Sequence, residues 1–217
     1  MFALIDWAFI DTVEGQLALE GYVPLGGKHN NYTGHSPPPK LWPNPQNKSG
    51  VTICAGFDLG QHSERQIREL HFDGAVTETL VKFAAPRVQL AACNALFAAQ
   101  GLKLAKPVAS QIDRRIKLRK MSKFMEVYGR HGARFDSIPS REIRTAIMSF
   151  AFQYGENGRW HGPTASKYWR AIIAQNWAEA RRILEKEYVH ENVWRRRKEA
   201  QLFHRAANLA VQVDGRI

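Results

Sequence analysis

The order of apolar and polar residues divides the chain into a turn-rich first third and a helical remainder. Residues 21–26 and 49–57 are short, β-prone segments bounded by glycine, which predicts a small sheet or hairpin. Between them, residues 26–50 are rich in Gly, Pro and Asn, so this stretch cannot form a helix. We expect a long loop there, of the kind that serves as a functional lid or a mobile insertion.

Helical periodicity starts near the N-terminus and dominates from Ser63 onward. The apolar face of the first predicted helix consists of Leu4, Ile5, Ala8 and Phe9. Arg141–Tyr154 is the most core-like segment, and Gly155 is placed to end it. Further helices are expected over residues 63–71, 86–100, 108–129, from Asn176 onward, and over about 191–212. The pattern predicts an α+β fold that is mainly α.

The length of the chain limits its domain organisation, and its charge limits the kinds of partner it can have. With 217 residues, of which 44% are hydrophobic, the chain suits a single domain with two lobes, at about residues 1–62 and 63–217. An excess of 31 Lys and Arg over 20 Asp and Glu gives a net charge of +11, which attracts polyanions of any kind. The basic residues lack a recognisable nucleic-acid-reading motif, so we expect no nucleic-acid partner. The basic run over 114–123 is interpreted as a solvated helix face.

Targeting, thiol and metal signals are sparse. No stretch approaches the eighteen or so apolar residues of a membrane span, and the N-terminus lacks the basic leader of a signal peptide. Cys54 and Cys93 stand in apolar surroundings, which favours two buried free thiols over a disulfide framework. No set of Cys, His and carboxylate residues has metal-ligand spacing, and no phosphate-binding glycine loop is present. We therefore expect no metal and no cofactor.

Three residues of the first third have the chemistry of glycoside cleavage, which needs a proton-donating acid and usually a second carboxylate. Glu14 follows an apolar helical turn and precedes Gly15, where the helix can stop. Thr52 and Asp58 are six residues apart across a Gly-containing turn, so a reversal there would bring the hydroxyl and the carboxylate together. Thr52 would then hold a water molecule on which Asp58 acts as base. The spacing alone leaves open that Glu14 is a surface carboxylate and that the other two are structural.

A resemblance to a known family supports the chemical interpretation. The runs TVEG (12–15), GYVP (21–24), SGVTICAGFDLGQ (49–61) and IRTAIMSFAFQYG (143–155) occur in the order found in the lysozyme domain of pesticin-type bacteriocins and related phage endolysins. The resemblance extends from about residue 10 to about residue 205. It implies the phage-lysozyme fold, a muramidase activity, and catalytic roles for Glu14, Thr52 and Asp58. The interval from Glu14 to Thr52 departs from the family, because the loop over 26–50 looks long.

Four further residues are weaker candidates. Gln61, beside Asp58, is placed to hydrogen-bond an acetamido group, and Gln153 and Tyr154 stand at a helix end expected to face the glycan. Arg197, or a neighbour in the run WRRRK, is a candidate partner of Glu14, since a cation there would orient the acid. A structural role remains the alternative for each of these residues.

The resemblance leads to a specific expectation of function. We expect a monomeric phage endolysin that hydrolyses the β-1,4 bond between N-acetylmuramic acid and N-acetylglucosamine in peptidoglycan. It would collect in the host cytoplasm and act on the wall in the periplasm, with its positive charge drawn to anionic lipopolysaccharide. The alternatives are the catalytic domain of a pesticin-like bacteriocin, a lytic transglycosylase, which ends in an anhydro sugar, and a non-catalytic wall-binding module.

Overall fold

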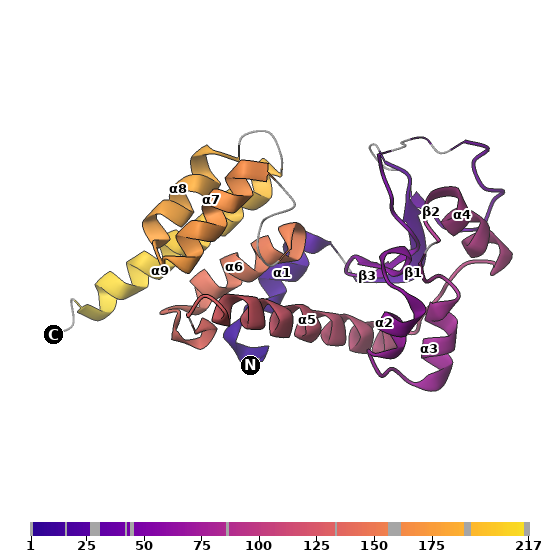
Figure 1. The fold of residues 1–217 in the computed structure, drawn as a ribbon, viewed down its shortest axis with the longest axis horizontal. Helices are drawn as coiled ribbons and strands as arrows, with labels where there is room; N and C mark the ends of the chain where they lie inside the picture. Colours follow the sequence, from indigo (N-terminus) through magenta and orange to yellow (C-terminus); the bar gives the residue numbers. More distant parts are fainter. Residues whose placement is uncertain are drawn as a thin grey trace. The chain divides into compact units, whose positions relative to one another are not determined.

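The computed structural model describes residues 2–15, 17–26, 31–41, 43, 46–85, 87–132, 134–155, 162–188 and 192–214. These residues are mostly helical with a small antiparallel sheet, which confirms the predicted α+β, mainly α fold (Figure 1). The chain forms two compact units. We call Glu14–Lys117 the sheet unit, and Met1–Val13 with Leu118–Ile217 the helical unit.

The sheet unit extends well beyond residue 62, where the sequence suggested a lobe boundary. Its elements are β1 (Ala18–Pro24), β2 (Asn31–Tyr32), β3 (Thr52–Cys54), β4 (Phe57–Asp58), the 3₁₀ turn η2 (Leu59–Gln61), α2 (Glu64–Arg68), α3 (Gly74–Val81), α4 (Gln89–Ala98) and the first half of α5 (Lys106–Gly129). Among the described residues, the strands make one antiparallel sheet in the order β2-β1-β3-β4. Helix α4 lies beside β1, and α2 lies beside α3 (Figure 1). These helices belong to the unit because their apolar residues share one core with the strands.

The segment over 26–50 is less irregular than its composition predicts. Asn31 and Tyr32 form β2, which pairs with β1 through Val23 and Pro24, so the expectation of a structureless loop is wrong at this point. Burial of the Tyr32 ring against the core supplies a physical reason for this pairing. Further along, the Asn47 side chain donates to the carbonyl of Pro24 at 2.8 Å. Residues 27–30, 42, 44 and 45 of the segment lie outside the described residues.

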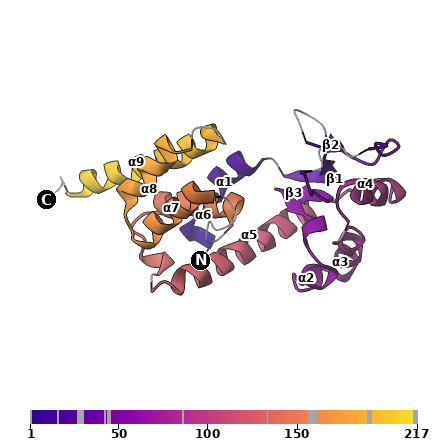
Figure 2. The ribbon, with the colours of Figure 1, turned by 45° about the horizontal axis from the view of Figure 1, so that its top comes forward.

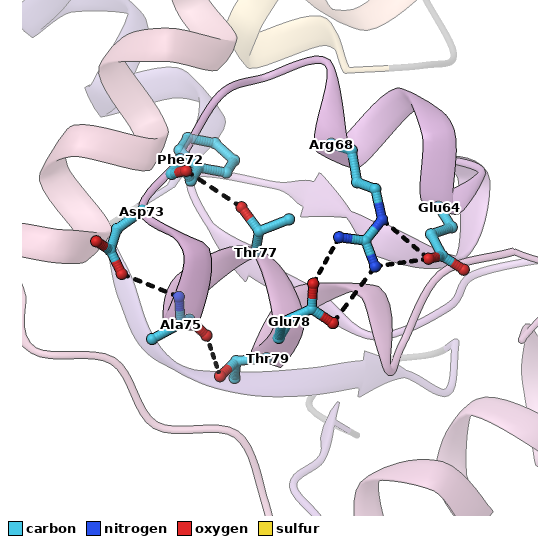
Figure 3. A network of polar contacts seen from close by, with 8 residues as sticks. All are labelled: Glu64, Arg68, Phe72, Asp73, Ala75, Thr77, Glu78 and Thr79. Atoms are coloured by element: carbon cyan, nitrogen blue, oxygen red, sulfur yellow. Dashed lines mark hydrogen bonds and ion pairs between the residues drawn. The ribbon is translucent and has the colours of Figure 1, made fainter.

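Polar contacts hold α2 and α3 together at the edge of the sheet unit (Figure 3). The Arg68 guanidinium spans two carboxylates, contacting Glu64 at 2.7 Å and Glu78 at 2.5 Å. The Asp73 side chain accepts from the backbone N–H of Ala75 at 2.9 Å and so caps α3. All of these side chains are exposed, so each ion pair contributes little to the free energy of unfolding and mainly orients the two short helices.

The starts of two predicted helices coincide with side-chain caps. Ser63 caps α2 in a reciprocal capping box with Gln66. Asn176 accepts from the backbone N–H of Glu179 and begins α8. The helix expected over 86–100 begins at Gln89, and Pro86 lies outside the described residues.

The helical unit is built around a second core. Its elements are the 3₁₀ turn η1 (Phe2–Leu4), α1 (Trp7–Glu14, of which the last residue belongs to the sheet unit), the second half of α5, the 3₁₀ turn η3 (Phe135–Ser137), α6 (Arg141–Tyr154), α7 (Gly162–Ile173), α8 (Trp177–Lys186) and α9 (Val193–Asp214). Helix α7 packs beside α8, and both α6 and α8 pack against α9 (Figure 2). Helix α6 has the bounds that the sequence predicted, and Gly155 ends it with a φ of +75°.

The first helix begins later than expected and buries a different face. The Asp6 side chain accepts from the backbone N–H of Phe9 at 3.2 Å, so Asp6 caps α1 and the helix proper starts at Trp7. Trp7, Ile10 and Val13 are the buried residues of α1. The predicted face of Leu4, Ile5, Ala8 and Phe9 is therefore wrong in part: Ile5 is buried ahead of the helix, and Ala8 is exposed.

The basic run on α5 is only partly solvated, which corrects the interpretation of 114–123 as a solvated face. Lys117 is 4% exposed and pairs with Asp113 at 2.6 Å within the sheet unit. Within the helical unit, the Lys120 ammonium lies 4.4 Å from the centroid of the Phe152 ring. Arg114, Arg119 and Lys123 are exposed. Across the described ranges, no helix combines the length and apolar character that a membrane span requires.

Candidate active site

Thr52 and Asp58 face each other across the hairpin of β3 and β4. They are cross-strand partners, as are Ile53 and Phe57, and the reversal between them uses positive φ angles at Cys54 and Gly56. Directly opposed residues of an antiparallel pair project from the same face of the sheet. The predicted proximity of the hydroxyl and the carboxylate therefore has a clear geometric basis in the register of this hairpin.

Two glycines hold the Asp58 carboxylate. Oδ1 accepts from the backbone N–H of Gly60 at 2.9 Å and from that of Gly50 at 3.1 Å, and Oδ2 shares the Gly50 N–H at 3.2 Å. The Gly60 contact makes Asp58 the cap of η2. A carboxylate has about four acceptor sites, so these contacts leave room for a proton or a water molecule. The orientation of Asp58 is thus set by main-chain atoms, which keeps the carboxylate in one position.

Burial changes the acidity of Asp58. The side chain is half-buried, and loss of solvation raises the pKa of its carboxyl group above the ordinary value. The N–H groups of Gly50 and Gly60 and the charge of His62 oppose that rise in pKa. The His62 ring is itself fixed, because its Nδ1 lies 2.8 Å from the Asp58 carbonyl oxygen and the ring forms a T-shaped pair with the Phe57 ring. An aspartate whose pKa is raised is better suited to take a proton from water near neutral pH.

Thr52 is buried, but its hydroxyl makes only a weak hydrogen bond. The side chain is 5% exposed, and its hydroxyl donates to the Gly50 carbonyl at a long 3.4 Å. A bond of that length is weak, so the Thr52 oxygen retains acceptor capacity toward a water molecule. The residue pair can therefore position water next to the Asp58 carboxylate.

Glu14 occupies the kind of position predicted for a proton donor. It is the last residue of α1, it is half-buried, and Gly15 ends the helix with a φ of +111°. By the division into compact units, Glu14 belongs to the sheet unit together with Thr52 and Asp58. Its role as catalytic acid remains a prediction.

Gln61 is engaged with the main chain. Its side-chain amide donates to the carbonyl of Lys48 at 2.6 Å, and the residue is otherwise exposed. This contact favours a structural role, in which Gln61 ties η2 to the segment before β3. A contact between Gln61 and an acetamido group stays a prediction.

The remaining candidates lie in the helical unit. Gln153 accepts from the Arg196 guanidinium at 2.9 Å, and Tyr154 is buried with its ring centroid 5.1 Å from that guanidinium. Arg196 and Arg195 are themselves buried and pair with Glu199 at 2.8 and 3.2 Å. Arg197, by contrast, is exposed. These contacts favour packing roles for Gln153 and Tyr154, and the pair of Glu14 with Arg197 stays a prediction.

Sequence reasoning missed several residues of this site. Gly50, Gly60 and His62 determine the environment of Asp58, and Tyr22 pairs with Thr52 from β1. A signal was present in the spacing, because Gly50 precedes Thr52 by two residues and Gly60 follows Asp58 by two. Two glycines at matching positions of a hairpin indicate a close main-chain approach. Among the described residues, no group of three or more His, Cys, Asp or Glu side chains could hold a metal ion.

Comparison with known protein families identifies the family of the chain. Residues 4–178 match the model of the pesticin family, which is described as a bacterial toxin homologue of phage lysozyme. No curated protein matches the chain. The match covers more than half of the chain, from before α1 into α8, and it includes Glu14, Thr52 and Asp58. The chain therefore belongs to the pesticin family of lysozyme-like domains.

Proposed function

We propose that this chain is a monomeric muramidase, which hydrolyses the β-1,4 bond between N-acetylmuramic acid and N-acetylglucosamine in bacterial peptidoglycan. Membership of a phage-lysozyme-like family supports a muramidase-type, peptidoglycan-degrading function. The observation that carries the proposal is the cross-strand pair of Thr52 and Asp58, whose carboxylate is held by two main-chain N–H groups.

The proposed reaction assigns one step to each residue. Glu14, protonated at the start, transfers its proton to the glycosidic oxygen as the bond from that oxygen to the anomeric carbon breaks. Thr52 holds a water molecule, whose oxygen forms the new bond to the anomeric carbon. Asp58 takes a proton from this water and stabilises the oxocarbenium-like transition state by its negative charge. The products are two shorter glycan strands, and one water molecule is consumed.

Product analysis tests the proposal directly. The chain is incubated with purified peptidoglycan, and the released muropeptides are identified by mass spectrometry. A hydrolase leaves a reducing N-acetylmuramic acid end, whereas a lytic transglycosylase leaves an anhydro sugar that is one water molecule lighter. A wall-binding module would release nothing, so absence of products under conditions of proven binding would contradict the proposal.

Variants with matched controls test the catalytic roles of Glu14 and Asp58. Glu14→Gln and Asp58→Asn should each lower the rate by about a hundredfold or more, as is typical for loss of general acid or base catalysis. Asp11→Asn is the control for Glu14, because it removes another carboxylate of α1. Asp73→Asn is the control for Asp58, because both residues cap a helical turn through a backbone N–H. Full activity of Glu14→Gln would exclude Glu14 as the acid.

We also propose that the enzyme acts as a phage endolysin, which collects in the host cytoplasm and reaches the wall in the periplasm. Description of the family as a toxin homologue supports the alternative of a bacteriocin domain. Expression inside bacteria separates the two, because an endolysin lyses the cells once the inner membrane is made permeable. Lysis that requires addition from outside would instead favour the toxin.

The surplus of basic residues supports a proposed attraction to anionic lipopolysaccharide. Exposed basic residues include Arg114, Arg119 and Lys123 on α5 and Arg197 and Lys198 on α9. Permeabilisation of outer membranes by Glu14→Gln, measured by uptake of a fluorescent dye, would support this attraction. Absence of dye uptake would mean that the positive charge of the protein only steers it toward the anionic surface and does not permeabilise the membrane.

A further inference from the structure

Tyr22 belongs to the same cross-strand row as the two hairpin residues of the candidate site. On β1, Tyr22 is the partner of Thr52, and Thr52 is in turn the partner of Asp58 on β4. Because residues directly opposite one another in antiparallel strands project from one face, Tyr22, Thr52 and Asp58 lie side by side on a single face of the sheet.

That face is the one turned away from the core of the sheet unit. Val23 and Ile53 are fully buried and Phe57 is 4% exposed, and all three contribute to the core. They alternate along the strands with Tyr22, Thr52 and Asp58, so the row projects to the opposite side. Tyr22 and Asp58 both retain partial solvent exposure. A ligand that reaches Asp58 from solvent therefore meets the Tyr22 side chain on the same face.

The pKa of the Tyr22 phenol also depends on the charge of Asp58. Burial raises the pKa of Tyr22, and the negative charge of Asp58 raises it further. The phenol thus keeps its proton through neutral and mildly alkaline pH, where it can donate a hydrogen bond. An aromatic side chain with a polar tip at the edge of a partly buried site suits a ligand that has both apolar and hydroxyl-bearing faces.

We propose that Tyr22 is a substrate-binding residue of this site, whose ring packs against the apolar face of the sugar next to Asp58 and whose hydroxyl donates to a polar substituent of that sugar. The inference rests on the proposed glycan hydrolase and extends it, because none of the three predicted catalytic residues has an aromatic ring. The ligand class is a β-1,4-linked N-acetylated glycan.

The first test needs no substrate. Phenolate absorbance is recorded against alkaline pH for the wild type and for Tyr22→Phe, and the difference isolates the ionisation of Tyr22. The same pair is then recorded in the Asp58→Asn background. Loss of the neighbouring negative charge should lower the pKa of Tyr22. An unchanged pKa of Tyr22 would mean that the two side chains are not close neighbours. This result would overturn the proposal, whatever the activity of the chain.

The second test uses soluble glycan strands freed of peptide by an amidase. Tyr22→Phe, which loses one neutral hydrogen bond, should lower kcat/KM by about three- to tenfold. Tyr22→Leu, which also loses the ring, should lower kcat/KM by about tenfold or more, mainly through a higher KM. Leu19→Ala removes a partly exposed apolar side chain from the same strand and should change neither constant. Wild-type constants for both Tyr22 variants would overturn the proposal.

The two proposals can fail separately. If Tyr22→Leu is impaired while Glu14→Gln and Asp58→Asn retain full activity, the assignment of the catalytic carboxylates fails and Tyr22 remains a binding residue. If no form of the chain cleaves glycan, binding of tri-N-acetylchitotriose is measured by calorimetry. Weaker binding by Tyr22→Leu than by Leu19→Ala would support the inference, and equal binding, or none by either, would overturn it.

Discussion

The main chains of Gly50 and Gly60 lie too close together for a side chain at either position. A Cβ atom on Gly50 would lie 2.4 Å from the Cα of Gly60, and one on Gly60 would lie 2.5 Å from the carbonyl oxygen of Arg87. Both obstacles are main-chain atoms, which cannot swing aside. Because the same two glycines donate their N–H groups to Asp58, this close packing also places the candidate base.

Substitution of either glycine should therefore destabilise the hairpin. We expect Gly50→Ala and Gly60→Ala each to lower the free energy of unfolding by about 1–3 kcal/mol, as overpacking does elsewhere, and to reduce glycan cleavage in the folded fraction. Gly74→Ala is the control, because a Cβ there meets no atom within 4 Å. Urea denaturation measures the change, and a Gly50→Ala variant as stable as Gly74→Ala would contradict the packing argument.

The pH dependence of cleavage should report Asp58 and its neighbour His62. Since burial raises the pKa of Asp58, activity should fall on acidification with a midpoint above the ordinary aspartate value of about 3.9. The positive charge of His62 lowers that pKa, so His62→Gln should move the acid limb to higher pH. Initial rates on soluble glycan strands, recorded against pH, measure the acid limb of the wild type and of His62→Gln. His131→Gln is the control. A limb that stays in place, or moves to lower pH, would remove His62 from this role.

The ionised carboxylate of Asp58 should also lower the free energy of unfolding at neutral pH. A carboxyl whose pKa is raised by folding binds its proton more tightly in the folded state, so its stabilising contribution is present below the unfolded pKa. The contribution is lost as pH rises through the folded pKa. We expect the melting temperature of Asp58→Asn, relative to wild type, to be higher at pH 7 than at pH 3. Asp73→Asn, which removes an exposed carboxylate, is the control.

Both cysteines should resist modification in the folded protein. Cys54 and Cys93 are buried free thiols, as predicted, and burial raises their pKa values to about 12 and about 11. Asp113 raises the pKa of Cys54 further, whereas Lys117 opposes this effect. Because the thiolate is the reactive form, Ellman's reagent at pH 8 should label neither cysteine until denaturant is added. Rapid labelling of the native chain would contradict this prediction.

Substitution of Glu199 should strongly destabilise the helical unit. It is fully buried and accepts from Ser149 at 2.5 Å as well as from Arg195 and Arg196. Glu199→Ala leaves two buried guanidinium groups without their counter-ion, which typically costs about 3–5 kcal/mol. Glu185→Ala removes a partly exposed partner of His204 and should change the free energy of unfolding little. Equal stabilities of the two variants, by chemical denaturation, would contradict the prediction.

Local features were predictable from the sequence because they depend on neighbours along the chain. The bounds of α6 follow from the spacing of its apolar residues and from Gly155, and the starts of α2 and α8 follow from Ser63 and Asn176. The six-residue interval between Thr52 and Asp58 likewise anticipated a reversal that joins them. Backbone hydrogen bonds within one turn or hairpin are enough to determine each of these features.

Tertiary packing decided the rest. A run of basic residues looks equally solvated along its whole length, yet Lys117, Arg195 and Arg196 are buried, because Asp113 and Glu199 compensate their charges inside the fold. The addition of β2, the contact of Gly50 with Gly60, and the alignment of Tyr22 with the hairpin join residues 7 to 30 positions apart. Sequence alone therefore determined the bounds of α6, the starts of α2 and α8 and the hairpin, where the controlling contacts are local. Only the three-dimensional structure decided which charges are buried and that Tyr22 lies in one row with Thr52 and Asp58, because burial and strand order depend on how whole segments pack together.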